Sequence, residues 1–140
     1  MPQRKNDRVV FDTNIIVSLL LKENFEFFVD LKYLHESVLY SCPELLMEIS
    51  NTLNYPHCKK YLNKPVKFYV DFVKDFSEQV AIDKRFDRAP DIKDNYLFDL
   101  AYTVKSFYLI TGDKPLLNMK QVNKIQIISL AEFKKELQAN

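Results

Sequence analysis

The sequence contains very little glycine, cysteine or histidine, and these shortages exclude several kinds of functional site. Its only glycine is Gly112. A phosphate-binding P-loop needs two glycines at fixed spacing and a dinucleotide-binding turn needs three, so both are excluded. The two cysteines, Cys42 and Cys58, form no C-x-x-C pair, and we expect them to be buried thiols in a reducing compartment. The two histidines are too scattered to complete a zinc site, and only the adjacent pair His57–Cys58 stays open as a fragment of one.

An excess of one charge and a long apolar run are also missing. Lys and Arg number 20 against 19 Asp and Glu, and the net charge is +1. Bulk charge therefore predicts neither nucleic-acid binding nor its absence, and such binding would need a local basic patch. The apolar run at residues 15–21 is broken by Ser18 and is shorter than the ~20 residues that span a bilayer. Asp12 and Asn14 argue against a signal peptide, so we expect a cytoplasmic protein without a membrane segment.

The length of 140 residues predicts one domain spanning residues 1–140, with residues 1–7 as a loose N-terminal arm. Short apolar runs and amphipathic stretches alternate along the chain, which predicts an α/β fold with a mainly parallel sheet and helices on both faces. The predicted strands are residues 8–11, 37–41, 80–82, 107–111 and 125–128. The predicted helices are residues 14–22, 25–34, 42–53, a short one within 57–64, 65–76, 91–104, a short one from 116, and 130–137.

Three local signals predict how particular elements begin or turn. The pattern S-x-x-E occurs at residues 41–44 and again at residues 129–132, and each occurrence predicts a capping box at the start of a helix. Gly112 follows a predicted strand, where we expect it to permit a tight turn.

Four acidic residues are predicted to meet at one edge of the sheet. Asp12 and Asp113 follow strands, Asp94 lies in the first turn of a helix, and Glu48 lies one turn into a helix that follows a strand. The ends of parallel strands and the starts of the following helices share an edge, and ligands bind there. Each acid also has a structural alternative: Asp12 as a cap, Asp113 as a turn residue, Glu48 as an exposed helix acid and Asp94 as a partner of the helix dipole. Asp99 is a secondary candidate, because five steps of about 100° place it off the face of Asp94.

Such a cluster is costly without a counter-charge. Two carboxylates ~5 Å apart repel by about 3 kcal/mol at an effective dielectric constant of ~20. Mg²⁺ or Mn²⁺ prefers carboxylate and water ligands, and such an ion can activate water to attack a phosphodiester. The charged loop at residues 84–90 contains Arg85 and Arg88, which are equally well read as RNA contacts or as a solvated surface.

At these acids the sequence resembles a known family. The segments VVFDTN (9–14), LLMEI (45–49), DIKDNYL (91–97) and LITGD (109–113) resemble, in order and spacing, the successive motifs of the PIN-domain nucleases. The ending TGDK (111–114) and the tail ISLAEF (128–133) resemble more closely the PIN subgroup of toxins from type II toxin–antitoxin operons.

The resemblance implies a three-layer α/β/α fold and a Mg²⁺- or Mn²⁺-dependent endoribonuclease that cuts single-stranded or structured RNA. It also implies a cognate antitoxin and a homodimer, for which we expect contacts at residues 25–33 and 57–76. Carried over by motif, the metal-site acids are Asp12, Glu48, Asp94 and Asp113, with Asp99 as an optional member. Asn14 and Thr111 carry over as polar residues that support these acids.

Three other interpretations stay open. A haloacid-dehalogenase-like phosphatase also begins with an aspartate after an apolar strand, but it needs a second aspartate where this chain has Asn14. A PIN nuclease of RNA maturation would have the same motifs without an antitoxin. A PIN domain that binds RNA or a protein without cutting would have the same fold without the reaction.

Overall fold

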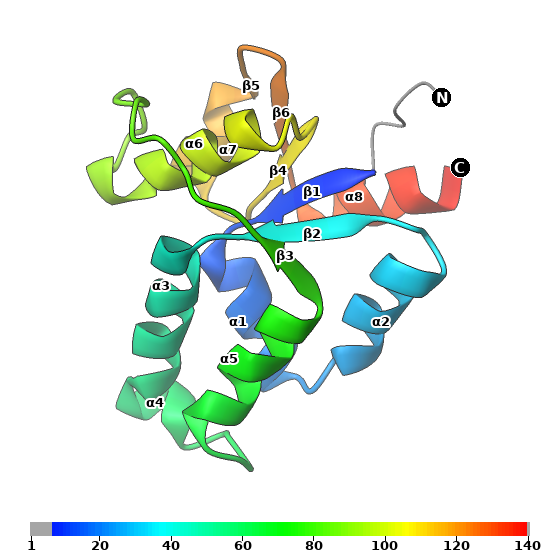
Figure 1. Ribbon diagram of the computed structural model, residues 1–140, viewed down its shortest axis with the longest axis vertical. Helices are drawn as coiled ribbons and strands as arrows, with labels where there is room; N and C mark the ends of the chain where they lie inside the picture. The colour runs from blue at the N-terminus through cyan, green and yellow to red at the C-terminus, as the bar shows by residue number, and fades with distance from the viewer. Residues whose placement is uncertain (1–6, 140) are drawn as a thin grey trace.

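The computed structural model describes residues 7–139, and most of the predicted N-terminal arm lies outside them. A six-stranded sheet forms the centre of the molecule, in the order β3-β2-β1-β4-β6-β5 (Figure 1). The strands are β1 (Arg8–Phe11), β2 (Val38–Ser41), β3 (Ser77–Gln79), β4 (Tyr108–Ile110), β5 (Gln121–Val122) and β6 (Ile125–Ile128). Neighbouring strands are parallel except for β5, which runs antiparallel to β6. The predicted mainly parallel sheet is confirmed.

Helices cover both faces of this sheet and make a three-layer α/β/α structure, as predicted. Helices α6 (Asn95–Thr103) and α7 (Lys114–Met119) lie on one side in Figure 1. Helices α1 (Thr13–Leu21), α2 (Phe25–Tyr33), α3 (Pro43–Asn54) and α5 (Val66–Asp75) lie on the other. Helix α8 (Leu130–Ala139) joins α2 on that side, because Phe133 and Phe27 both contact the ring of Phe11. Two short elements complete the chain: α4 (Pro56–Lys59) and the 3₁₀-helix η1 (Ile92–Asp94).

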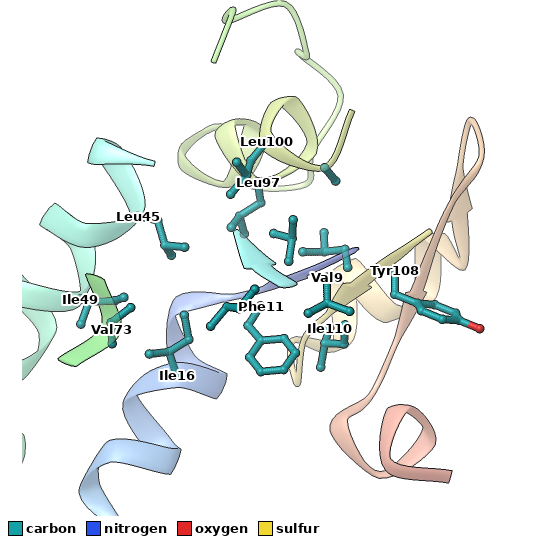
Figure 2. Close-up of a cluster of buried hydrophobic side chains, with 14 of the residues drawn as sticks. Val9, Phe11, Ile16, Leu45, Ile49, Val73, Leu97, Leu100, Tyr108 and Ile110 are labelled. Atoms are coloured by element: carbon teal, nitrogen blue, oxygen red, sulfur yellow. The ribbon is translucent and has the colours of Figure 1, made fainter. Parts of the chain in front are cut away.

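The central strand β1 is buried from both sides, and this explains its continuous apolar run. Val9, Val10 and Phe11 are fully buried. Figure 2 shows Leu97 and Leu100 of α6 on one side of β1 and Ile16 of α1 on the other. Strands that are covered on both faces are apolar at successive positions rather than at alternate ones. Asp12 is the first polar residue after this run, and the buried strand before it therefore fixes its position at the edge of the sheet.

One predicted strand is displaced along the chain. We expected it at residues 80–82, whereas β3 occupies Ser77–Gln79 and pairs with β2. Val80 continues the pairing only through a single hydrogen bond from its N–H to the carbonyl of Ser41 (2.9 Å). The prediction was wrong because β3 is an edge strand with exposed polar residues, and the apolar signal that marks buried strands is absent from it. The two-residue strand β5 gave no such signal either.

One of the two capping boxes is wrong and the other forms its cap. Ser41 ends strand β2, where its Oγ lies 2.8 Å from that of Ser77, and Cys42 occupies the N-cap of α3 instead. In the second box, Ser129 Oγ accepts a hydrogen bond from the N–H of Glu132 (3.2 Å). The two sequences are alike, but Ser41 is the last residue of strand β2, and the position before α3 is occupied by Cys42.

The predicted need for glycine at position 112 is also wrong. Gly112 does not have a positive φ, and a Cβ placed on it would meet only Ile15 Cδ1 at 3.9 Å, an ordinary contact. The left-handed positions are instead occupied by other residues: Glu23, Glu36, Lys105, Lys120 and Asn123. Both cysteines are buried and free, as expected. No helix within residues 7–139 is long and apolar enough to cross a membrane.

Candidate functional site

Asp12 lies at the carboxyl end of β1, where the structure gives its side chain no capping role. Its backbone N–H binds the carbonyl of Ile110 in β4 (2.9 Å), and its position is the N-cap of α1. The carboxylate makes no capping hydrogen bond to that helix, and instead Oδ2 accepts one from Thr111 Oγ1 (2.7 Å). Burial raises the pKa of Asp12 and the nearby Glu48 raises it further, whereas the Thr111 hydrogen bond and the backbone N–H groups of Asn14 and Thr13 lower it. Because the pKa still rises, these donors offset only part of the cost of burying the charge.

Thr111 links Asp12 to the next acid along the sheet edge. It is fully buried directly after β4, and its Oγ1 accepts a hydrogen bond from the N–H of Asp113 (3.1 Å) while donating to Asp12. Asp113 caps α7, because its Oδ2 accepts from the N–H of Leu116 (3.3 Å). The structural alternative for Asp113 is therefore present, and its cap interaction uses one carboxylate oxygen.

Glu48 is joined to the site by a tyrosine to which sequence reasoning gave no role. Tyr96 Oη donates a 2.5 Å hydrogen bond to Glu48 Oε2, and it lies 3.2 Å from Thr13 Oγ1. Burial, followed by the hydrogen bond to Glu48, raises the pKa of Tyr96, so the phenol keeps its proton and acts as a donor. Thr13 follows Asp12 directly, so Tyr96 connects α3 to the end of β1. Its place two residues after Asp94, inside a chemistry-bearing motif, was the only signal in the sequence.

The pKa of Asp94 indicates that the four predicted acids lie close together. Its side chain makes no capping hydrogen bond at the start of α6. Burial raises the pKa of Asp94 to about 6, and Asp12, Asp91, Glu48 and Asp113 each raise it further by charge repulsion. The carboxylates from β1, α3, η1 and the end of β4 therefore share one negative region at the carboxyl edge of the sheet.

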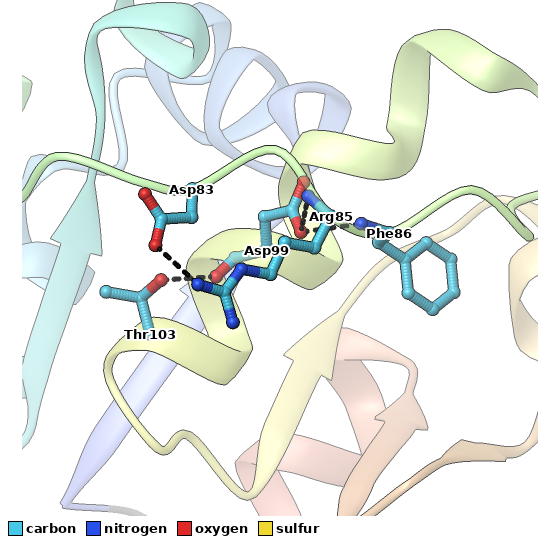
Figure 3. A network of polar contacts seen from close by, with 5 residues as sticks. All are labelled: Asp83, Arg85, Phe86, Asp99 and Thr103. Atoms are coloured by element: carbon cyan, nitrogen blue, oxygen red, sulfur yellow. Dashed lines mark hydrogen bonds and ion pairs between the residues drawn. The ribbon is translucent and has the colours of Figure 1, made fainter.

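Two predicted members of the site have different surroundings. Asn14 is exposed on the first turn of α1, and among residues 7–139 its side chain has no hydrogen-bond partner. Asp99 is buried on α6, where its Oδ1 accepts hydrogen bonds from the backbone N–H groups of Arg85 (3.1 Å) and Phe86 (2.9 Å), as Figure 3 shows. Thus Thr111 supports the acidic edge directly, whereas Asp99 holds a loop.

The donor set suits a hard divalent cation, although its side chains are not yet arranged around one. Carboxylate oxygens are the ligands that Mg²⁺ and Mn²⁺ prefer, and the mutual repulsion that raises the pKa of Asp94 is what a cation would relieve. Within the described residues, no group of three or more His, Cys, Asp or Glu side chains stands ready to hold a metal ion. A bound cation would therefore have to draw the carboxylates closer together than they lie in this structure.

The raised pKa of Asp94 predicts how the stability of the metal-free protein depends on pH. The folded protein holds the proton of Asp94 more tightly than the unfolded chain does, where the carboxyl has its ordinary pKa of 3.8. The resulting stabilisation is present below pH 3.8 and is lost as the pH rises through about 6. Asp94→Asn should therefore raise the melting temperature in EDTA at pH 7.5 by roughly 2–4 °C, a modest shift because the group is half-exposed. The difference should vanish near pH 4. Equal melting temperatures at pH 7.5 would contradict the assignment.

Comparison with known proteins agrees with this geometry. A family model described as PIN domain matches residues 8–115. The matched range begins with β1 and ends in the first turn of α7, so it contains all four acids of the edge together with Thr111 and Tyr96. Comparison with curated proteins gave no match to the sequence.

Proposed function

Because this chain belongs to the PIN-domain family, we propose that it is a Mg²⁺- or Mn²⁺-dependent endoribonuclease. PIN domains are generally nucleases, and the metal and the RNA substrate are the proposed parts. The observation that carries the proposal is the placement of the four acids at one edge of the sheet, where burial and then the neighbouring acids raise the pKa of Asp94 to about 6. Carboxylates that gather without a paired cation favour the binding of a divalent cation, whereas capping or packing alone does not call for such a cluster.

In this proposal each residue of the edge has a physical task. Asp12, Glu48, Asp94 and Asp113 hold the cation, which when bound supplies an activated water and neutralises charge on the phosphodiester. Thr111 fixes the rotamer of Asp12 through its 2.7 Å hydrogen bond. Tyr96 fixes Glu48 from α6, so that the carboxylate is held on the site side of α3. Supporting hydrogen bonds of this kind orient metal ligands and set their basicity.

The proposal is tested with purified protein and a labelled single-stranded RNA. Cleavage is expected with Mn²⁺ or Mg²⁺, loss of cleavage in EDTA, and recovery when the ion is returned in excess. Preparations from two independent purification schemes should give the same specific activity, which controls for contaminating ribonucleases. Cleavage that persists in EDTA, or no cleavage of any RNA with either ion, overturns the assignment.

We further propose that the nuclease is the toxin of a toxin–antitoxin pair and acts as a homodimer. Support comes from the TGDK ending and the capped tail helix of the sequence. Most of the aromatic stretch expected to meet a second copy is internal, because Phe25 and Phe28 pack against Phe72 of α5. Tyr33 and Leu34 remain exposed at the end of α2, and they are the surface we assign to subunit contact.

The toxin role is tested by expressing the chain alone and together with the adjacent gene. Growth arrest that is relieved by a small co-transcribed DNA-binding protein is the expected result. Normal growth at high expression of a protein that cleaves RNA in vitro would favour a role in RNA maturation.

A further inference from the structure

The loop between β3 and η1 is the longest irregular segment of the described chain. Residues 80–91 have no helix or strand, and they connect the edge strand β3 to the start of α6 (Figure 1). Irregular connections of about this length are uncommon in a compact domain and are usually either functional or disordered. The segment contains three basic residues, Lys84, Arg85 and Arg88, together with Asp83 and Asp87.

Despite its irregular backbone, the loop is held firmly against α6. The buried carboxylate of Asp99 accepts the N–H groups of both Arg85 and Phe86 (Figure 3). The ring of Phe86 stacks on that of Phe98, with centroids 4.4 Å apart and planes inclined by 17°. Hydrogen bonds from backbone N–H groups to a carboxylate are stronger than hydrogen bonds between two neutral groups. Asp99 therefore fixes the backbone at the centre of the loop.

Further contacts place the loop beside the acidic edge. The N–H of Ala89 donates to Asn95 Oδ1 (2.9 Å), next to Asp94 in the chain. At the other end, Lys84 Nζ lies 3.6 Å from the carboxylate of Glu44, which is one turn before Glu48 on α3. The loop thus spans the two helical segments that carry Glu48 and Asp94.

The fixed backbone directs its arginine side chains outward. The Arg85 side chain is 78% exposed, and its one ion pair is with the equally exposed Asp83 (3.3 Å). Such an exposed ion pair contributes little to stability, so Arg85 could exchange it for a phosphate group. The Arg88 guanidinium lies 5.4 Å from the centre of the Phe86 ring, and among residues 7–139 it has no ion-pair partner.

A cavity of about 1080 Å³ lies along this loop and α6. Four cations line it: Arg85, Arg88, Lys105 and Lys124. The acids that line it are Asp83, Asp87 and Asp99, and the carboxylate of Asp99 is already bound by two N–H groups. The exposed ring of Tyr102 also faces the cavity, whereas none of the four edge acids lines it. The cavity extends along α6 toward the amino-terminal ends of β4 and β6 and is separate from the acidic edge.

We propose that the segment 83–89 binds the RNA backbone beside the acidic edge, and that Asp99 is a positioning residue for this segment rather than a metal ligand. The inference rests on the proposed nuclease function. The edge acids repel a phosphodiester, so a strand must be held by cations close by, and arginine binds phosphate in a bidentate geometry. Aromatic rings among cations, here the exposed Tyr102 and the partly buried Phe86, are typical of surfaces that bind single strands by base stacking.

The first test measures binding without cleavage. A fluorescent single-stranded RNA is titrated in EDTA with the wild type and with Arg85→Gln/Arg88→Gln. Each phosphate contact on a single strand contributes about 0.7 to the salt dependence, so the double variant should lower the slope of log K against log salt by about 1.4 and weaken binding at low salt. Lys74→Gln/Lys135→Gln removes the same charge from exposed positions on α5 and α8 and should leave the slope unchanged. Equal slopes for both double variants overturn the proposal.

The second test separates the two roles of Asp99. Asp99→Asn keeps an oxygen that accepts the two N–H groups, whereas Asp99→Ala removes it. If Asp99 positions the loop, Asp99→Ala raises KM for RNA as the arginine pair does, Asp99→Asn restores it, and Mn²⁺ affinity stays constant. A loss of Mn²⁺ affinity in Asp99→Asn overturns the positioning role, and this readout holds even if Asp99→Ala fails to fold. Because the first test needs no catalysis, a protein that binds RNA through the arginines but never cuts it refutes the nuclease proposal alone.

Discussion

Asp12→Asn is expected to lower kcat/KM for RNA cleavage by about 10³-fold, the scale at which loss of one charge-stabilising group acts in other active sites. The metal-free variant should nevertheless melt at the same temperature as the wild type or slightly above it. The amide oxygen can still accept the Thr111 hydrogen bond, while the buried negative charge beside Glu48 is gone. Asp12 is thus predicted to be costly for folding and essential for chemistry.

Initial rates with Mn²⁺ and thermal unfolding in EDTA measure both halves of this prediction. Asp75→Asn is the matched control, because it removes one negative charge from an exposed position at the end of α5. The control should change neither quantity. A fall of many degrees in Asp12→Asn would instead identify Asp12 as a structural cap of α1, and full activity would remove it from the site.

Tyr96→Phe should have the second-largest effect. The substitution keeps the ring and deletes the hydroxyl that binds Glu48 and Thr13. Loss of a partner that orients a metal ligand typically costs 10–100-fold in activity or metal affinity, so we expect kcat to fall by about that factor at fixed Mn²⁺. The KM for RNA should stay nearly constant, because Tyr96 does not belong to the segment 83–89.

Steady-state kinetics over a range of Mn²⁺ concentrations tests this role of Tyr96. Tyr102→Phe is the comparison on the same helix, since the Tyr102 side chain is exposed and a phenylalanine keeps its ring. Excess Mn²⁺ should recover part of the activity of Tyr96→Phe, as expected when a ligand is present but poorly oriented. Unchanged kcat would show that Glu48 needs no support, and an unfolded protein would show that Tyr96 is a core residue first.

The positions of the four acids were predictable because they follow from local patterns. An aspartate directly after a buried strand has only one place to go in a parallel sheet, namely its carboxyl edge. The burial of Val9 to Phe11 on both faces and the short buried strand β4 therefore fixed where Asp12 and Asp113 lie. The same logic fails for β3, whose polar residues pair with β2 at an edge where burial leaves no pattern.

The contacts that orient the acids were not predictable from the sequence. The hydrogen bond between Tyr96 and Glu48 joins residues 48 positions apart, and the bond between Thr111 and Asp12 joins residues 99 apart. No periodicity encodes such a pairing, because it depends on how two helices sit on the sheet. Asp99 shows the converse: the family resemblance made it an optional metal ligand, whereas its carboxylate accepts hydrogen bonds from the backbone of a loop that helical spacing does not predict.

The central claim is that the carboxylates of Asp12, Glu48, Asp94 and Asp113 together form one binding site for the catalytic divalent cation. A Mn²⁺ titration by calorimetry tests this claim most directly. The wild type should bind Mn²⁺ in the absence of RNA, and Asp12→Asn and Asp113→Asn should each weaken that binding at least about tenfold, the smallest loss expected even from a residue that only orients a ligand. Asp75→Asn should bind as the wild type does. Mn²⁺ affinity that is the same in all four proteins would contradict the account.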